Sequence, residues 1–257
     1  MKTVLTIAGS DPSGGAGIQA DMKTFAAHGL YGMSVITALT AQNTMGVTDV
    51  LPVPPEFFVK QLEAVLSDIP PDAVKIGMMP DADIIEITAE LLEKYSISNI
   101  VTDTVMVSTS GRRLTNENAV DVLKKRLLCR SRIITPNIPE AEVLWGNKIG
   151  SETDMKAAAK DISRETQGAV LVKGGHMEGS AADILYCGEF FRFESERIDN
   201  PNTHGTGCTL SSAIACGLAE GLDIPRSVEK AKKYLTAAIR AGLSLGHGIG
   251  PLNHLIK

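Results

Sequence analysis

The sequence predicts an α/β fold in three layers, with a mostly parallel central sheet covered by helices on both faces. Short, almost continuously apolar segments alternate along the chain with longer segments of helical periodicity. Strands that read as continuous apolar runs are typical of parallel sheets buried on both sides. No linker-like segment, repeat or low-complexity tract interrupts this alternation, so we expect residues 1–257 to form a single domain.

The elements follow from apolar spacing and from turn residues. The expected strands are 4–7, 35–39, 73–77, 100–103, 133–135 and 169–173, with a shorter extended segment at 47–53 and a hairpin of 184–186 with 190–193. The expected helices are 16–28, one that begins at Pro55, 84–92, 118–128, one that ends at 166, 210–219 and a last helix that begins near Pro225. Proline is tolerated at the first position of a helix, as at Pro55. Ser151 and Asp154 are expected to form a capping box.

Composition excludes several classes of function. The apolar share of 44% supports a substantial core, and no apolar run reaches the roughly 18 residues of a membrane span. The first seven residues carry one charge and a short apolar stretch, which indicates a strand rather than a signal peptide and a cytoplasmic protein. The net charge of −5 argues against nucleic acid as the partner. The four cysteines form no CxxC pair, which argues against structural zinc.

Polar residues follow many of the expected strands. In open parallel sheets, ligands bind beyond the carboxyl ends of the strands. We therefore expect one rim to gather Ser10, Asp11, Gln42, Asn43, Lys75, Met78, Asp103, Asn137 and residues 173–176.

The segment THGTGCT at 203–209 predicts an anion site. It is a glycine-rich turn that opens a small and apolar helix. The first N–H groups of a helix lack intrahelical partners, and the helix dipole favours negative charge at that end. Gly205 and Gly207 have no Cβ, so a ligand can approach the backbone, while Thr206 and Thr209 add hydroxyl donors. The alternative interpretation is an ordinary helix start with good packing residues.

Other phosphate-binding motifs are incomplete or absent. The segment GAGIQA at 15–20 matches the loose dinucleotide fingerprint, which alone is a weak signal. The fingerprint also requires an acidic residue at the end of the second strand, and that strand ends in LTAQ at 39–42. A nicotinamide-dependent enzyme is therefore disfavoured. The chain contains no GxxxxGK[ST], so an ordinary P-loop is excluded.

Together these motifs resemble one family. THGTGC at 203–208 is similar to the C-terminal signature of the ribokinase-like superfamily, in which sugar and nucleoside kinases carry aspartate where this chain has Cys208. Cysteine there resembles the vitamin-kinase branch, which holds the hydroxymethylpyrimidine (phosphate) kinases and some pyridoxal kinases. Further matches run along nearly the whole chain: AGSDPSGGAGIQAD at 8–21, TAQNT at 40–44, KIGM at 75–78, VMVS at 105–108, TPNIPEAE at 135–142, VKGGH at 172–176 and GPLNH at 250–254.

The resemblance implies an ATP-dependent kinase for 4-amino-5-hydroxymethyl-2-methylpyrimidine and for its monophosphate. Gln42 is expected to read the aminopyrimidine edge, because a primary amide offers one acceptor and two donors. The alternative interpretation is that Gln42 is only a polar residue at the end of a strand. Gly9, Met78 and Val105 are expected beside the substrate, and Asp21 either contacts its rim or anchors the first helix. Pyridoxal kinase, and a non-catalytic nucleotide- or vitamin-binding protein, remain as alternatives.

The resemblance also implies how the phosphates are held. The backbone of Gly205, Thr206 and Gly207, with Thr203, is expected to hold the transferring group, and Lys173 to neutralise its charge. The alternative for Lys173 is a solvated strand-end lysine. The metal is expected to be Mg²⁺, held through water by the residues Asn137, Glu140 and Asp103, with Asn137 also near the nucleotide. The alternative for Asn137 and Glu140 is a helix cap.

Cys208 is the expected base. A free thiol has a pKa of about 8.5, which a helix N-terminus lowers, so a thiolate there would accept the proton of the hydroxymethyl group. In the alternative interpretation Cys208 is a small buried residue, and backbone and metal carry the reaction.

Three further expectations accompany the resemblance. They are an adenine pocket around residues 172–176 and the last two helices, a lid at 106–113, and a homodimer. Thr104 departs from the family pattern, because relatives have a proline there that rigidifies the strand end.

Overall fold

The computed structural model describes residues 1–106, 117–175, 182–194 and 198–256. The strands are β1 (Thr3–Ser10), β2 (Tyr31–Asn43), β3 (Gly46–Pro52), β4 (Ala73–Ile76), β5 (Ile100–Thr102), β6 (Ile133–Ile134), β7 (Ala169–Val172), β8 (Asp183–Tyr186) and β9 (Phe190–Phe193). The helices are α1 (Gly17–Ala27), α2 (Pro55–Asp68), α3 (Ala82–Lys94), α4 (Glu117–Val122), α5 (Ile138–Trp145), α6 (Glu152–Thr166), α7 (Thr206–Ala219) and α8 (Ile224–Ala241).

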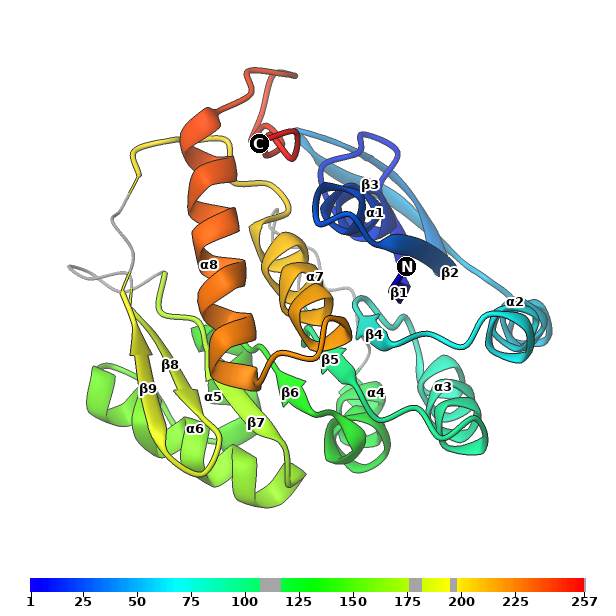
Figure 1. Cartoon of the computed structure of the whole chain (residues 1–257), viewed down its shortest axis with the longest axis horizontal. Helices are drawn as coiled ribbons and strands as arrows, with labels where there is room; N and C mark the ends of the chain where they lie inside the picture. Colours follow the sequence, from blue (N-terminus) through cyan, green and yellow to red (C-terminus); the bar gives the residue numbers. More distant parts are fainter. Residues whose placement is uncertain (107–116, 176–181, 195–197, 257) are drawn as a thin grey trace.

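The described strands form one sheet in the order β3-β2-β1-β4-β5-β6-β7-β8-β9 (Figure 1). Six adjacent strands run parallel, in the order β2, β1, β4, β5, β6 and β7. At the two edges of the sheet, β3, β8 and β9 join by antiparallel pairing. The predicted α/β class with a mostly parallel sheet is confirmed.

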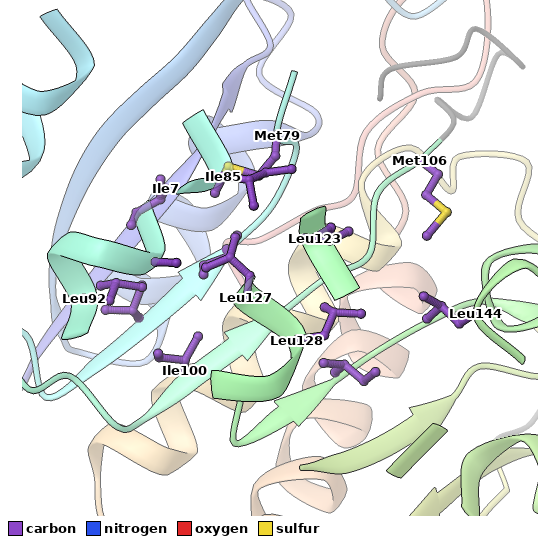
Figure 2. Close-up of a cluster of buried hydrophobic side chains, with 14 of the residues drawn as sticks. Ile7, Met79, Ile85, Leu92, Ile100, Met106, Leu123, Leu127, Leu128 and Leu144 are labelled. Carbon is purple, nitrogen blue, oxygen red and sulfur yellow. The ribbon is translucent and has the colours of Figure 1, made fainter. Parts of the chain in front are cut away.

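Each face of the sheet carries its own apolar core. Successive side chains of a strand point to opposite faces, and in β1 Leu5 and Ile7 pack toward α2–α6 while Val4 packs toward α1, α7 and α8. Figure 2 shows part of the first core, to which Ile7 and Ile100 of the sheet and Leu127 of the segment after α4 contribute. The helices therefore sandwich the sheet, as the three-layer expectation requires.

Several element boundaries differ from the sequence prediction. The strand expected at 4–7 continues to Ser10, and the helix expected at 210–219 begins at Thr206. The strand expected at 35–39 extends over Tyr31–Asn43, because its polar end pairs with the antiparallel β3 up to Asn43 and Gly46. The single helix expected at 118–128 is instead α4 followed by a π-helical turn, Leu123–Leu127, and a 3₁₀ turn, Leu128–Arg130. Apolar spacing does not distinguish these helical forms.

The capping box predicted for Ser151 and Asp154 does not form, whereas the helix cap considered for Asn137 and Glu140 does. Ser151 caps α6 by accepting from the N–H of Asp154, but the Asp154 carboxylate accepts from Ser151 Oγ and from the N–H of Gly150. The reciprocal capping box lies at the start of α5, between Asn137 and Glu140. None of the helices in the described residues is long and apolar enough to span a bilayer.

Candidate active site

A cavity of about 770 Å³ opens at the carboxyl ends of the parallel strands. Most of the predicted site residues line it: Gly9, Gln42, Met78, Asp103, Val105, Asn137, Glu140, Lys173, Thr203, Gly205, Thr206, Gly207 and Cys208. Asp21, Asn43 and Thr209 do not line it, and the buried hydroxyl of Thr209 instead lies 2.9 Å from His254 Nε2. The sheet topology thus gathers residues that lie far apart in the sequence, as the rule for open α/β sheets requires. The lid predicted at 106–113 lies outside the described residues except for Met106, which is buried and lines the cavity.

The turn at 203–209 begins α7, with Gly205 at the N-cap in a left-handed conformation (φ +86°). No side chain caps this helix. The N–H of Thr206 donates to the carbonyl of Thr203, and that of Thr209 to the carbonyl of Gly205. Gly207 and Cys208 line the cavity between them with backbone N–H groups that this first turn leaves available to an anion.

Replacing Gly205 with alanine is expected to lower kcat/KM by roughly 100-fold or more, the loss typical of a damaged oxyanion site. A Cβ at Gly205 would lie 1.9 Å from the carbonyl oxygen of Gly15, so the two loops would have to separate. Gly146 is the matched control, because it has a similar φ of +82° and nothing within 4 Å of its Cβ position. Steady-state kinetics should therefore show normal activity for Gly146→Ala. Equal activity of both variants would contradict the account.

Cys208 does not have the lowered pKa expected from its place at a helix N-terminus. Burial raises the pKa of the thiol to about 11, although Lys75 and the N–H of Gly17 oppose this change. The carboxylates of Asp21 and Asp103 raise the pKa further. The helix-end effect that the sequence predicted is thus outweighed by desolvation and by nearby negative charge, and the resting side chain is a thiol.

Lys173 and Asp103 form a buried ion pair at the first turn of α7. Lys173 Nζ lies 2.9 Å from Asp103 Oδ1, and Thr135 Oγ1 donates to the same oxygen at 3.1 Å. Burial lowers the pKa of Lys173, but Asp103 and Glu140 raise it more, so the ammonium stays charged. A Cβ at Gly207 would lie 3.6 Å from Lys173 Nζ. The cation therefore stands beside the available backbone N–H groups.

Asn137 and Glu140 are a helix cap in this structure. Asn137 Oδ1 accepts from the N–H of Glu140 at 2.9 Å, and Glu140 Oε2 accepts from the N–H of Asn137 at 2.9 Å. Thr104 Oγ1 also donates to Glu140 Oε2, at 3.0 Å. Proline has no hydroxyl, so Thr104 adds a contact to this carboxylate. Burial raises the pKa of Glu140, and the charge of Lys173 opposes this.

Asp21 lies under the cavity and not in its wall. Its fully buried carboxylate pairs with Lys75 Nζ at 2.9 Å and accepts from Thr6 Oγ1 at 2.6 Å and Ser212 Oγ at 2.7 Å. Thr6 and Lys75 are neighbours in register on β1 and β4, and Ser212 belongs to α7. Of the two roles left open for Asp21, these contacts favour the anchoring of α1.

Two residues of the site had no predicted role. Asp11, at the end of β1, and His204, inside the anion turn, both line the cavity, and His204 Nε2 lies 2.8 Å from Asp11 Oδ2. His204 also contacts the amide of Gln42. The position of His204 next to Gly205 in the motif was the available signal, but spacing alone did not connect it to residues almost two hundred positions earlier.

Comparisons with known proteins agree with this geometry. The family model for phosphomethylpyrimidine kinase matches residues 11–253. A hydroxymethylpyrimidine/phosphomethylpyrimidine kinase of Haemophilus influenzae is 44% identical over 260 residues, which cover 99% of this chain and 97% of that protein. A bifunctional thiamine biosynthesis protein of Geobacter sulfurreducens is 51% identical over 256 residues, and the chain spans about half of its length (52%).

Two solved structures are also similar. The phosphomethylpyrimidine kinase of Clostridium difficile has a TM-score of 0.84 and 50% identity, covering 93% of this chain and 100% of that one. The pyridoxal kinase of Bacillus subtilis, solved as an ADP complex, has a TM-score of 0.92 and 38% identity, covering 99% and 97% of the two chains. Fold and site thus define a ribokinase-like vitamin kinase. Within that class, the chain belongs to the phosphomethylpyrimidine kinase family.

Proposed function

We propose that the chain transfers the γ-phosphoryl group of ATP to 4-amino-5-hydroxymethyl-2-methylpyrimidine and to its monophosphate. This is the hydroxymethylpyrimidine/phosphomethylpyrimidine kinase activity of thiamine biosynthesis that its family and relatives carry. The observation that carries the proposal is a single cavity with the uncapped N-terminus of α7 and Lys173 in its wall, together with Gln42. The first two fit a phosphoryl group, and the amide of Gln42 fits an aminopyrimidine.

The transferring group is proposed to lie on the backbone N–H groups of Gly207 and Cys208. Phosphoryl transfer depends mostly on positioning and on neutralising charge. Lys173 supplies a permanent positive charge beside these groups, and Thr203 and Thr206 line the same wall. Gly205 keeps the turn open through its left-handed conformation.

Mg²⁺ is proposed to bind near Asp103 and Glu140, through water. Both carboxylates line the cavity, and oxygen ligands suit this ion, which usually keeps several of its waters. Asn137 Oδ1 is already an acceptor in the cap of α5, which fits contact through water better than direct ligation. The described residues contain no group of three or more His, Cys, Asp or Glu side chains that would hold a metal alone. When bound, the ion would neutralise charge on the phosphate oxygens.

Cys208 is proposed to accept the proton of the hydroxymethyl group. With the thiol pKa at about 11, the reactive thiolate is a minor species at neutral pH. Its fraction grows about tenfold per pH unit below that pKa. In this proposal, the small thiolate fraction supplies the base at the same helix end that holds the transferring group.

Cys208→Ala is expected to lower kcat by about 10²- to 10⁴-fold, the usual contribution of general base catalysis, with little change in substrate affinity. The kcat of the unmodified enzyme should rise with pH between about 7 and 10, because deprotonation creates the base. The variant should lose that slope. If the variant kept its full kcat and the pH slope, Cys208 would not be the base, and only the role of the backbone N–H groups of Gly207 and Cys208 would remain.

Three other features are proposed for the chain. One continuous sheet supports a single kinase domain over residues 1–257. The edge strand β3 and its neighbour β2 expose a cross-strand pair, Leu39 and Leu51, which supports a homodimer through this edge. The four free cysteines support a reducing compartment, the cytoplasm.

A coupled assay of ATP consumption tests the function. We expect consumption with the hydroxymethylpyrimidine and with its monophosphate, and much slower consumption with pyridoxal. Pyridoxal is the second candidate substrate, because pyridoxal kinases superpose on 99% of the chain. Faster turnover of pyridoxal would reverse the assignment, and no ATP consumption with any of the three compounds would indicate a binding protein.

A further inference from the structure

The contact with the carboxylate of Asp11 determines that His204 carries a hydrogen on Nε2. Asp11 Oδ1 accepts from the N–H and hydroxyl of Ser13, at 2.9 and 2.7 Å. Its Oδ2 accepts from the N–H of Gly15 at 3.1 Å and of Ala16 at 2.8 Å, and lies 2.8 Å from His204 Nε2. Burial raises the pKa of Asp11, but the contacts with His204, Ser13 and Ala16 outweigh it and lower the pKa to about 2. An ionised carboxylate only accepts, so His204 Nε2 carries the hydrogen.

This proton conflicts with the present orientation of the Gln42 amide. The amide nitrogen of Gln42 lies 3.2 Å from His204 Nε2, which places a donor against a donor. Its amide oxygen lies 3.3 Å from Thr40 Oγ1, whose single hydrogen goes to the Ser10 carbonyl at 2.7 Å. A half-turn of the amide removes both conflicts. The amide oxygen then shares the Nε2 hydrogen of His204 with Asp11 in a three-centre bond, and the amide nitrogen donates to Thr40.

His204 is held firmly enough to fix that orientation. Its side chain is nearly buried, and its backbone N–H donates to the Gly250 carbonyl at 3.1 Å. A Cβ at Gly15 would lie 2.4 Å from His204 Cδ2, so the ring packs directly on the loop that holds Asp11. The ring also precedes Gly205, the cap of α7, so one turn carries both the anion site and the contact to Gln42.

We propose that His204, oriented by Asp11, is a positioning residue that fixes which edge of the Gln42 amide faces the substrate and thereby selects 4-aminopyrimidines over 4-oxopyrimidines. This inference rests on the proposed function. After its contacts to His204 and Thr40, the amide keeps one oxygen lone pair and one N–H for a ligand.

The two kinds of pyrimidine differ in the order of their hydrogen-bonding groups. A 4-aminopyrimidine offers an N–H donor beside a ring nitrogen acceptor, and a 4-oxopyrimidine offers an oxygen acceptor beside a ring N–H. The transfer site dictates where the hydroxymethyl group points, so the ligand does not turn over to adapt. An amide locked in one orientation therefore pairs fully with only one of them, and mispaired buried polar groups are costly.

Dissociation constants of the amino alcohol and of its 4-oxo analogue, measured by calorimetry without ATP, test the proposal. We expect the chain to favour the amino compound by about 100-fold or more. His204→Phe keeps a ring but cannot donate, and should reduce that preference by about tenfold or more, because the amide can then turn. His204→Gln places an amide N–H near the former Nε2 and should restore most of the preference. Equal weakening of both ligands by His204→Phe would overturn the proposal.

A second variant keeps the test informative if the phenylalanine variant does not fold. Thr40→Val removes the other contact that orients Gln42, and should also reduce the preference for the amino compound. An unchanged preference in a folded Thr40→Val variant would then overturn the proposal. Phosphoryl transfer by the unmodified chain is measured separately. A chain that shows the predicted shifts in preference but consumes no ATP would refute the kinase function and leave the role of His204 standing.

Discussion

Replacing Lys173 with methionine is expected to lower kcat about 10³-fold while leaving the affinity for the aminopyrimidine nearly unchanged. Methionine has a side chain of similar length, so the substitution mainly removes the positive charge of Lys173. The ammonium stands beside Gly207 and stays protonated under the influence of Asp103 and Glu140. We therefore expect it to neutralise the charge that spreads over the phosphoryl oxygens during transfer. Steady-state kinetics with ATP and the pyrimidine alcohol provide the measurement.

Lys232 is the matched control for this prediction. It also lines the cavity and also pairs with a carboxylate, Asp183, at 2.6 Å. Its partner differs, because Asp183 also accepts from the N–H of Gly174 and is not part of the proposed metal site. Lys232→Met should lower kcat less than about tenfold. Comparable losses of kcat in the two variants would mean that catalysis depends on the total charge of the cavity, and not on the position of Lys173 beside the first turn of α7.

Replacing Asp21 with alanine is expected to destabilise the chain by about 3–5 kcal/mol. The substitution leaves the ammonium of Lys75 fully buried without its carboxylate, and Thr6 and Ser212 also lose their acceptor. For a chain of this length that corresponds to a fall in Tm of roughly 10 °C. Denaturant unfolding, with its midpoint and slope, measures the loss directly.

The double variant Asp21→Leu with Lys75→Met separates charge from packing. Replacing a buried ion pair with apolar groups of similar size is often nearly neutral, so much of the lost stability should return. If the single and double variants were equally unstable, packing around Asp21 would matter more than the unpaired lysine. If Asp21→Ala kept its full stability and lost substrate binding, the substrate-contact role would be restored.

The sequence predicted the positions of the strand ends and hence the membership of the site. The expected strands ended at Asp103, Thr135 and Lys173, with Asn137 two residues after Thr135, and parallel strands bring such ends together whatever their separation in the chain. The anion turn was predicted from Gly205 and Gly207, because their spacing and the small residues after them are local signals.

Features that depend on three-dimensional surroundings were not predictable in this way. The thiol of Cys208 stands at a helix N-terminus, where a lowered pKa is the usual expectation, but burial and the carboxylates of Asp21 and Asp103 reverse it. Local sequence contains no measure of that desolvation. The contact between His204 and Asp11 likewise depends on how two distant loops pack, which periodicity does not encode.

In the proposed mechanism, the first turn of α7 holds the phosphoryl group while it is transferred to the aminopyrimidine. A crystal structure of the chain with ADP, aluminium fluoride and the pyrimidine alcohol would test this role, because the fluoride complex mimics the transferring group. We expect fluorine atoms within hydrogen-bond distance of the N–H groups of Gly207 and Cys208, with Lys173 Nζ beside them. The hydroxymethyl oxygen should lie in line near Cys208, and the amino edge of the ring should lie on Gln42. A fluoride complex bound away from α7 would contradict the account.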